Sequence, residues 1–286
     1  PAFFYFLGFE LEAPMKKRIF ALLLCAVFAL SFTACAATPE DARKVLESAM
    51  ENVNQAESMS YGMELAASME IAGQAIDMNY LMDIDSIMKP SMLLRISMTM
   101  ELYNALSATV TSYVEQNADG SFTAYSTVDG YSWERTETLS ALQYDAAGMM
   151  DSYMDNLEEI RHVGTERIEG RVADRYDCTI RREYFEEAFG MSGMDSLFDI
   201  LPASFSAEDF YNSLGDLKFT IWIDRQAMLP VKYSIDMRDV MQEMYNKLLS
   251  AAGVTDSITI GTLSTTVTFR DINNVAPFEV PAEAKQ

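Results

Sequence analysis

Much of the chain alternates between apolar and polar residues with a period of two. Three such stretches follow one another between residues 63 and 102, separated by Gly73-Gln74 and by Lys89-Pro90. Because successive side chains of a strand point to opposite faces, the pattern predicts three long strands, each with one apolar face. The apolar positions are Met63, Leu65, Ala67, Met69, Ile71, Ile76, Met78, Tyr80, Met82, Ile84, Leu94, Ile96, Met98, Met100 and Leu102.

Similar patterns continue towards residue 272. They predict strands over about 107–117, 121–128, 131–136, 159–168, 171–181, 216–224, 229–237 and 257–272. Asp129-Gly130 and Glu169-Gly170 favour hairpin turns between neighbouring strands. Short turns between successive strands indicate an antiparallel, up-and-down sheet of about nine to eleven strands, with one solvated and one covered face.

Other stretches have helical spacing. Thr38-Pro39-Glu40-Asp41 is a favourable helix start, with a Thr N-cap, Pro at the first helical position and acidic residues at the positive end of the helix dipole. We expect a helix over 39–56, and further helical segments over 139–155, 183–214 and 239–251. No linker divides residues 35–286, so the prediction is a single α+β domain.

The segment before this domain has the layout of a bacterial export signal. Lys16, Lys17 and Arg18 precede an apolar run that ends at Phe32-Thr33-Ala34-Cys35. The last four residues resemble a lipobox, which implies cleavage before Cys35 and lipidation of its sulfur. The alternative is a secreted protein cleaved near Ala36-Ala37. Residues 15–34 are thus the predicted signal peptide. Residues 1–14 are interpreted as an upstream artefact, or else as part of a longer signal anchor.

Composition excludes several classes of function. The net charge of -22 disfavours nucleic acid as a partner. His162 is the single histidine, so a multi-histidine metal site or a typical catalytic triad is not expected. Cys178 lies in a strand-like stretch and is expected to be an inert buried thiol. No phosphate-binding glycine loop is present, and we expect no cofactor and no metal.

Two segments indicate a family resemblance. WIDRQAMLPVKYSID (222–236) and GTERIEGRVADRYDCTI (164–180), together with the lipobox and the strand layout, resemble lipoproteins of the LolA/LolB and LppX/LprG types and uncharacterised Gram-positive lipoproteins. The resemblance implies a curved half-barrel with helices packed on its concave apolar face. It brings no catalytic residues with it, and better-known relatives hold acyl chains or lipidated proteins.

The predicted function is therefore non-enzymatic. We expect a monomeric lipoprotein, lipid-anchored through Cys35 at the extracytoplasmic face of the cell membrane, that binds a lipid, an acyl chain or a lipidated partner. The predicted ligand-binding residues are Met63, Leu65, Met69, Ile71, Met78, Tyr80, Met82, Leu94, Ile96, Met98 and Met100.

Three alternatives stay open. The half-barrel could be filled, in a structural, interaction or sensor lipoprotein without a ligand. An enzyme would need convergent carboxylates or hydroxyls in a cleft. Methionine clusters could bind copper, with Met149-Met150 and Met191/Met194 as the closely spaced pairs.

Overall fold

The structure is a computed structural model that describes residues 38–71, 73–102, 106–138, 154–181, 215–251 and 258–286. Residues Pro39–Gln286 form one compact unit that contains every described helix and strand. Because this unit has its own sheet and core, we expect it to fold without the residues before it. The predicted helices over 139–155 and 183–214 lie outside the described residues, apart from Met154 and Asp155.

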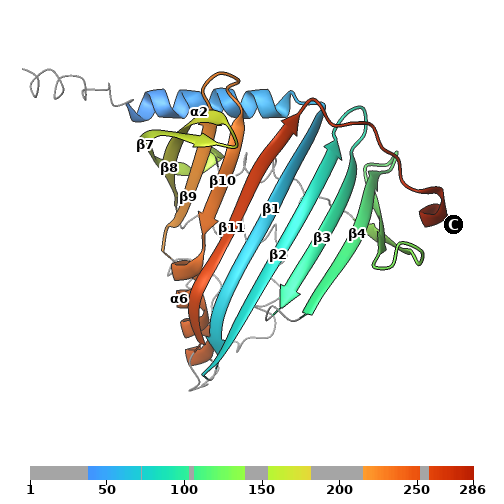
Figure 1. Ribbon diagram of the computed structural model, residues 1–286. Helices are drawn as coiled ribbons and strands as arrows, with labels where there is room; N and C mark the ends of the chain where they lie inside the picture. Colours follow the sequence, from blue (N-terminus) through green and yellow to red (C-terminus); the bar gives the residue numbers. More distant parts are fainter. Residues whose placement is uncertain (1–37, 72, 103–105, 139–153, 182–214, 252–257) are drawn as a thin grey trace, which may run out of the picture. The chain divides into compact units, whose positions relative to one another are not determined.

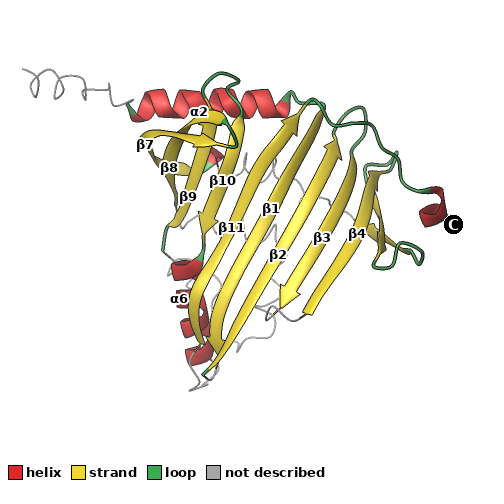
Figure 2. Ribbon diagram, viewed as in Figure 1, coloured by secondary structure: helices red, strands yellow, loops and turns green. Residues whose placement is uncertain are grey.

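Among the described residues, eleven antiparallel strands form one sheet in the order β6-β5-β4-β3-β2-β1-β11-β10-β9-β8-β7 (Figures 1 and 2). This confirms the predicted α+β class with a large antiparallel sheet. The strands are β1 (Ser58–Ile71), β2 (Gln74–Ile87), β3 (Leu93–Leu102), β4 (Leu106–Gln116), β5 (Phe122–Thr127), β6 (Glu134–Thr138), β7 (Leu157–Ile168), β8 (Arg171–Ile180), β9 (Leu217–Asp224), β10 (Pro230–Asp236) and β11 (Ile258–Ile272).

The sheet consists of two up-and-down halves. Strands β1 to β6 follow one another from the middle of the sheet to one edge, and β11 to β7 follow one another from the middle to the other edge. The first and last strands, β1 and β11, pair in the middle. In this pairing Met63 of β1 lies opposite Val267 of β11. Strands β6 and β7, although consecutive in the sequence, therefore occupy opposite edges of the sheet.

Helices cover one face of the sheet, which we call the core face; the opposite face is the outer face. Helix α2 (Pro39–Asn54) buries apolar residues at helical spacing: Ala42, Leu46, Ala49, Met50 and Val53. Helix α6 (Arg238–Ala251) adds Val240 and Met244 to the same core. The core joins these helices to Tyr61, Ile84, Leu94, Ile221 and Val267 of both sheet halves.

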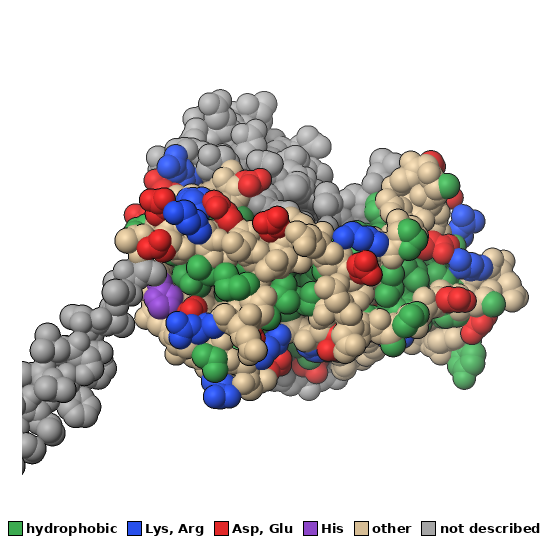
Figure 3. Space-filling model, turned by 90° about the horizontal axis from the view of Figure 1, so that it is seen from above, with side chains coloured by type: hydrophobic (Ala, Val, Ile, Leu, Met, Phe, Trp, Pro, Cys, Tyr) green, Lys and Arg blue, Asp and Glu red, His purple; other side chains and the backbone are tan. Residues whose placement is uncertain are grey.

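Hydrogen bonds connect the end of α2 to three loops at one end of the sheet. Asn52 Nδ2 donates to the Met228 carbonyl (2.8 Å) and Lys89 Nζ to the Gln55 carbonyl (3.0 Å). The backbone N–H of Glu57, just after α2, donates to Asn273 Oδ1 (2.7 Å). We call this the α2 end of the sheet. Seen from this side, hydrophobic side chains form a band between charged side chains (Figure 3).

The segment after β11 lies on the outer face of the sheet half that contains β4 and β5. Val280 and Ala284, the latter in the short 3₁₀ helix η5 (Ala282–Lys285), are buried with Tyr125 of β5. The ring of Phe278 lies 6.4 Å from that of Tyr113 on β4. Both faces of the sheet are thus partly covered, by helices on the core face and by this segment on the outer face.

Candidate ligand-binding face

The predicted ligand-binding residues all lie on the core face, in rows that cross β1, β2 and β3. In one row Met63 pairs with Met82 and Met82 with Met98. In the next row Leu65 pairs with Tyr80 and Tyr80 with Met100. Directly paired residues on one face of a sheet contact each other, so these side chains form a continuous surface. Met69, Ile71, Met78, Leu94 and Ile96 belong to further rows of the same face.

Burial of these residues falls with distance from the α2 end. Met63, Leu94 and Ile96 are 7%, 1% and 2% exposed and belong to the main core. Further along the strands Leu65, Met69, Met78, Tyr80, Met82 and Met98 are half-buried. Ile71 and Met100 are 36% and 38% exposed. Three of the predicted residues are therefore core residues, and the other eight form what we call the open apolar patch.

The core face also has an aromatic part, which the sequence pattern did not indicate. The ring centroids of Phe219 and Tyr233 lie 5.7 Å apart, and those of Tyr233 and Phe269 6.1 Å apart. The ring centroid of Phe269 lies 5.9 Å from that of Tyr61 on β1. These rings fill the α2 end across β9, β10, β11 and β1. The alternation in 216–224 and 229–237 predicted that Phe219 and Tyr233 lie on strands. It did not indicate that these strands lie near β1, which follows from the strand order.

A cleft of about 480 Å³ lies beside α2. Its lining residues are Arg43, Glu47, Met50, Glu51, Asn54, Gln55, Met154 and Asp155. The Arg43 guanidinium donates to the Leu157 carbonyl (2.9 Å), which ties α2 to the edge strand β7. Buried Met50 and Met154 are the apolar lining residues, and three carboxylates line the cleft as well. The cleft and the open apolar patch have no residue in common.

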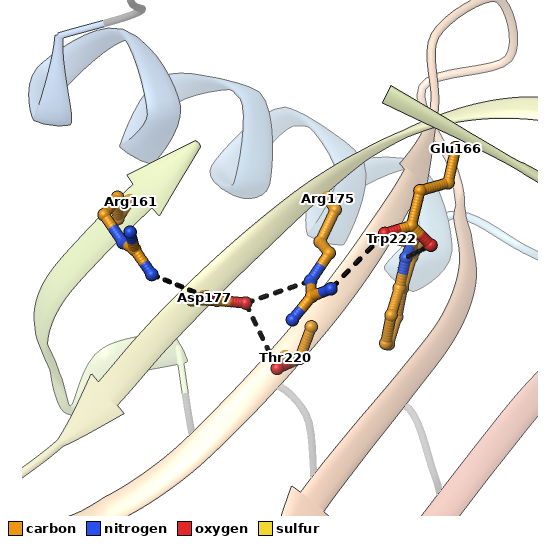
Figure 4. A network of polar contacts seen from close by, with 6 residues as sticks. All are labelled: Arg161, Glu166, Arg175, Asp177, Thr220 and Trp222. Carbon is orange, nitrogen blue, oxygen red and sulfur yellow. Dashed lines mark hydrogen bonds and ion pairs between the residues drawn. The ribbon is translucent and has the colours of Figure 1, made fainter. Parts of the chain in front are cut away.

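A polar network occupies the outer face of β7, β8 and β9 (Figure 4). Asp177 accepts from Arg161 (2.9 Å) and from Arg175 Nε (3.1 Å). Glu166 accepts from Arg175 Nη1 (3.4 Å) and from the indole N–H of Trp222 (3.0 Å). Burial alone would lower the pKa of Arg175, but Asp177 and Glu166 raise it. Both carboxylates have cationic partners, so the network joins three strands and does not present an unpaired catalytic acid.

His162 and Cys178 are not arranged for nucleophilic chemistry. His162 Nε2 lies 3.3 Å from Asp174 Oδ1, and Asp174 also pairs with Arg225 (3.0 Å). Cys178 is buried on β8, and burial raises the pKa of its thiol to about 12. A thiol with this pKa is protonated at neutral pH and is a poor nucleophile.

The described residues lack both a metal-binding cluster and a membrane-spanning helix. They contain no group of three or more His, Cys, Asp or Glu side chains that could hold a metal ion. No helix within these ranges is long and apolar enough to cross a membrane. Cys35 and the methionine pairs Met149-Met150 and Met191/Met194 lie outside the described residues.

No protein-family model and no curated protein matches the chain. Solved structures with similarity to it include LprF from Mycobacterium bovis, at 13% identity and a TM-score of 0.47, covering 87% of this chain and 99% of that chain. Lipoprotein LppX from Mycobacterium tuberculosis has 13% identity and a TM-score of 0.42, with 85% and 100% covered. A LolA superfamily protein from Nitrosomonas europaea has 10% identity and a TM-score of 0.23, with 82% and 94% covered. These are the kinds of protein that the sequence resembles, and the fold assignment itself rests on the strand pairing described above.

Proposed function

We propose that this chain is a lipoprotein, anchored through Cys35 at the extracytoplasmic face of the cell membrane, that binds a hydrophobic ligand without catalysing a reaction. The ligand would be a lipid or a lipidated partner, held on the open apolar patch. The observation that carries the proposal is the exposure of Ile71 and Met100 on the face that elsewhere forms the core. Contiguous apolar surface that a fold leaves accessible is typical of a binding site.

The dimensions of the open apolar patch suit an acyl chain. Leu65 and Ile71 lie six positions apart on one strand, which corresponds to roughly 20 Å at about 3.3 Å per residue. The patch crosses three strands that are spaced by about 4.8 Å. Burial of apolar area contributes about 25 cal/mol per Å², so a chain laid along these strands would gain affinity over its whole length.

Methionine makes this patch adaptable. Met69, Met78, Met82, Met98 and Met100 supply unbranched, polarizable side chains with several rotatable bonds. Such side chains can repack around ligands of different shape. The patch therefore suits a class of acyl chains better than one rigid molecule.

The position of Cys35 supports the anchoring part of the proposal. Cys35 precedes Pro39, the first residue of α2, by four positions. Four residues span at most about 14 Å, so lipidation of Cys35 would keep the folded unit close to the membrane surface. A diacylglycerol group provides two chains, which suffices for stable anchoring.

Native mass spectrometry tests the ligand. Residues 36–286, purified from a bacterial host, are expected to carry lipid that organic extraction releases and that a fluorescent fatty acid displaces. Met98→Lys, which puts a charge on the open apolar patch, should weaken fatty-acid binding at least roughly tenfold. Ser97→Lys makes the same charge change on the outer face and should leave binding unchanged.

If the protein has the mass of the chain alone and binds no fatty acid, the proposal that it binds a hydrophobic ligand is wrong. An interaction lipoprotein with a filled half-barrel would then be favoured. The anchor has a separate test in the full chain expressed in bacteria. Cys35→Ser should move the protein from the membrane fraction to the soluble or secreted fraction. If this variant stays membrane-bound and the wild-type chain carries no lipid on Cys35, the anchoring part is wrong.

A further inference from the structure

The open apolar patch concentrates methionine sulfur at an accessible place. Met82 of β2 is paired directly with Met98 of β3, and Met100 is two residues further along the same face. Met78 lies on the same face of β2 and Met69 on that of β1. Met100 is more than one-third exposed, whereas Met59, Met63 and Met244 are buried in the main core.

An accessible thioether reacts with peroxides. The sulfur lone pair attacks one oxygen of hydrogen peroxide, the O–O bond breaks and an S–O bond forms. The departing hydroxide takes up the proton, so the products are methionine sulfoxide and water. The sulfur loses two electrons and the peroxide gains them. A reductase specific for methionine sulfoxide reverses the change with a dithiol as reductant, which becomes a disulfide, and the sulfoxide oxygen leaves as water.

We propose that Met100, with the neighbouring Met82 and Met98, is a sulfoxidation site that converts the open apolar patch from a ligand-binding to a ligand-releasing surface. The oxidant is a peroxide. The effect on the ligand rests on the proposed function, whereas the selective oxidation of these residues does not.

The surroundings of these sulfurs explain why oxidation would matter. Met98 pairs on its other side with Val110 and Met100 with Ala108, and neither side chain offers a hydrogen-bond donor. Tyr80 pairs with both Leu65 and Met100, so its hydroxyl is a hydrogen-bond donor in the row of Met100. The row of Met82 and Met98 has no such donor on these three strands. A sulfoxide oxygen covered by an acyl chain would therefore lose water without gaining an adequate partner. Burying a polar group in this way is unfavourable, and ligand affinity should fall.

The order of oxidation follows from burial. Peroxide must reach the sulfur, so Met100 should react first, and the half-buried Met82 and Met98 should follow. Met59 and Met244 lie in the packed core and should react only when the protein unfolds. They serve as internal controls within the same molecule.

The experiment treats residues 36–286 with graded hydrogen peroxide and maps the oxidised methionines by peptide mass spectrometry. A fluorescent fatty acid then reports binding. Oxidation of Met100 before Met59 and Met244, with at least a roughly tenfold loss of affinity, is the expected result. Methionine sulfoxide reductase, with dithiothreitol as reductant, should restore binding. In a triple variant, Met82→Leu, Met98→Leu and Met100→Leu, peroxide treatment should not change the fatty-acid affinity from the variant's own value before treatment.

Several outcomes would overturn the proposal in whole or in part. Oxidation of Met100 no faster than that of Met59 would rule out the modification site. Selective oxidation with unchanged fatty-acid affinity, or an equal loss of affinity in the triple leucine variant, would rule out the release of ligand. A protein that oxidises selectively at Met100 but binds no fatty acid before treatment would retain the modification site and refute the proposed function together with the release step.

Discussion

Lys285 forms an ion pair with Glu115 of β4, with 2.6 Å between Nζ and Oε2. The hydroxyl of Tyr125 donates to the other oxygen of the same carboxylate (2.8 Å). Lys285 Nζ also lies 5.9 Å from the centre of the Tyr125 ring. These contacts hold the segment after β11 on the outer face, where it buries Val280 and Ala284.

Lys285→Met should destabilise this attachment in a pH-dependent way. Burial raises the pKa of Glu115, but hydrogen bonds from Lys285 and Tyr125 and nearby positive charge lower it below its usual value. A carboxyl whose pKa is lower in the folded than in the unfolded state stabilises the fold at pH values above its unfolded-state pKa. This contribution is lost as the pH falls through its folded-state pKa. The pair is partly exposed, so the loss at pH 7 should stay below about 1 kcal/mol.

Thermal unfolding at pH 7 and at pH 3 measures the effect of Lys285→Met. The melting temperature should be lower than that of the wild type at pH 7, and the difference should be smaller at pH 3. Lys247→Met, which removes an ion pair within α6, is the matched control and should change little. An equal difference at both pH values would show that the ion pair is not the cause.

Leu46→Ala should be strongly destabilising. Leu46 is fully buried between α2 and the sheet, and removing its side-chain atoms leaves a cavity in the main core. Such substitutions cost about 2–5 kcal/mol. Urea unfolding of residues 36–286 should show a lower midpoint for Leu46→Ala. The exposed neighbour gives the control, since Glu47→Ala should be nearly neutral. Similar stability of both variants would mean that α2 does not pack on the core face.

Asp129 should organise the loop between β5 and β6. Its Oδ1 accepts the backbone N–H groups of Tyr131 (2.8 Å) and Ser132 (2.7 Å), and these bonds hold the pKa of the carboxyl well below its usual value. In Asp129→Ala the amides of Tyr131 and Ser132 should exchange faster with solvent, as measured by hydrogen exchange. Asp129→Asn keeps one acceptor oxygen and should have an intermediate effect. Unchanged exchange in the alanine variant would show that the loop holds its shape without this side chain.

The strands were predictable because their alternation is long and regular. The period of two predicted β1, β2 and β3 to within a few residues, and Glu169-Gly170 predicted the turn between β7 and β8. Asp129-Gly130 predicted a turn with a strand from residue 131, but β6 begins at Glu134. The Asp129 side chain competes for the backbone N–H groups that an immediate return strand would use. A side-chain bond of this kind is not visible in an apolar and polar pattern.

The pairing of β1 with β11 and the extent of the open apolar patch were not predictable. Alternation tells which residues share a face, but it does not name the neighbouring strand or the helix above it. Met63 and Met100 have the same pattern in the sequence, yet one is buried in the main core and the other is exposed. The difference depends on distance from the α2 end, which requires the strand register.

Cys178 provides a last prediction, which tests the packing of the other sheet half. Cys178 on β8 pairs with Ile160 of β7 and with Phe219 of β9, and burial raises the pKa of its thiol to about 12. Residues 36–286 contain no other cysteine, so a thiol reagent such as DTNB reports on this position alone. At pH 8 the folded protein should react far more slowly than the protein unfolded in guanidinium, because both access and thiolate are lacking.

The raised pKa of Cys178 also sets the sign of a stability change. Above the ordinary thiol pKa of 9.0, the unfolded state loses its proton first, so stability should fall as the pH rises further. In a Cys178→Ala variant this component of the alkaline loss should disappear. A second change in that variant, Ser107→Cys, places a thiol at an exposed position of β4 that should react promptly in the folded protein. Equally prompt labelling of Cys178 in the folded wild type would mean that β7, β8 and β9 do not enclose it.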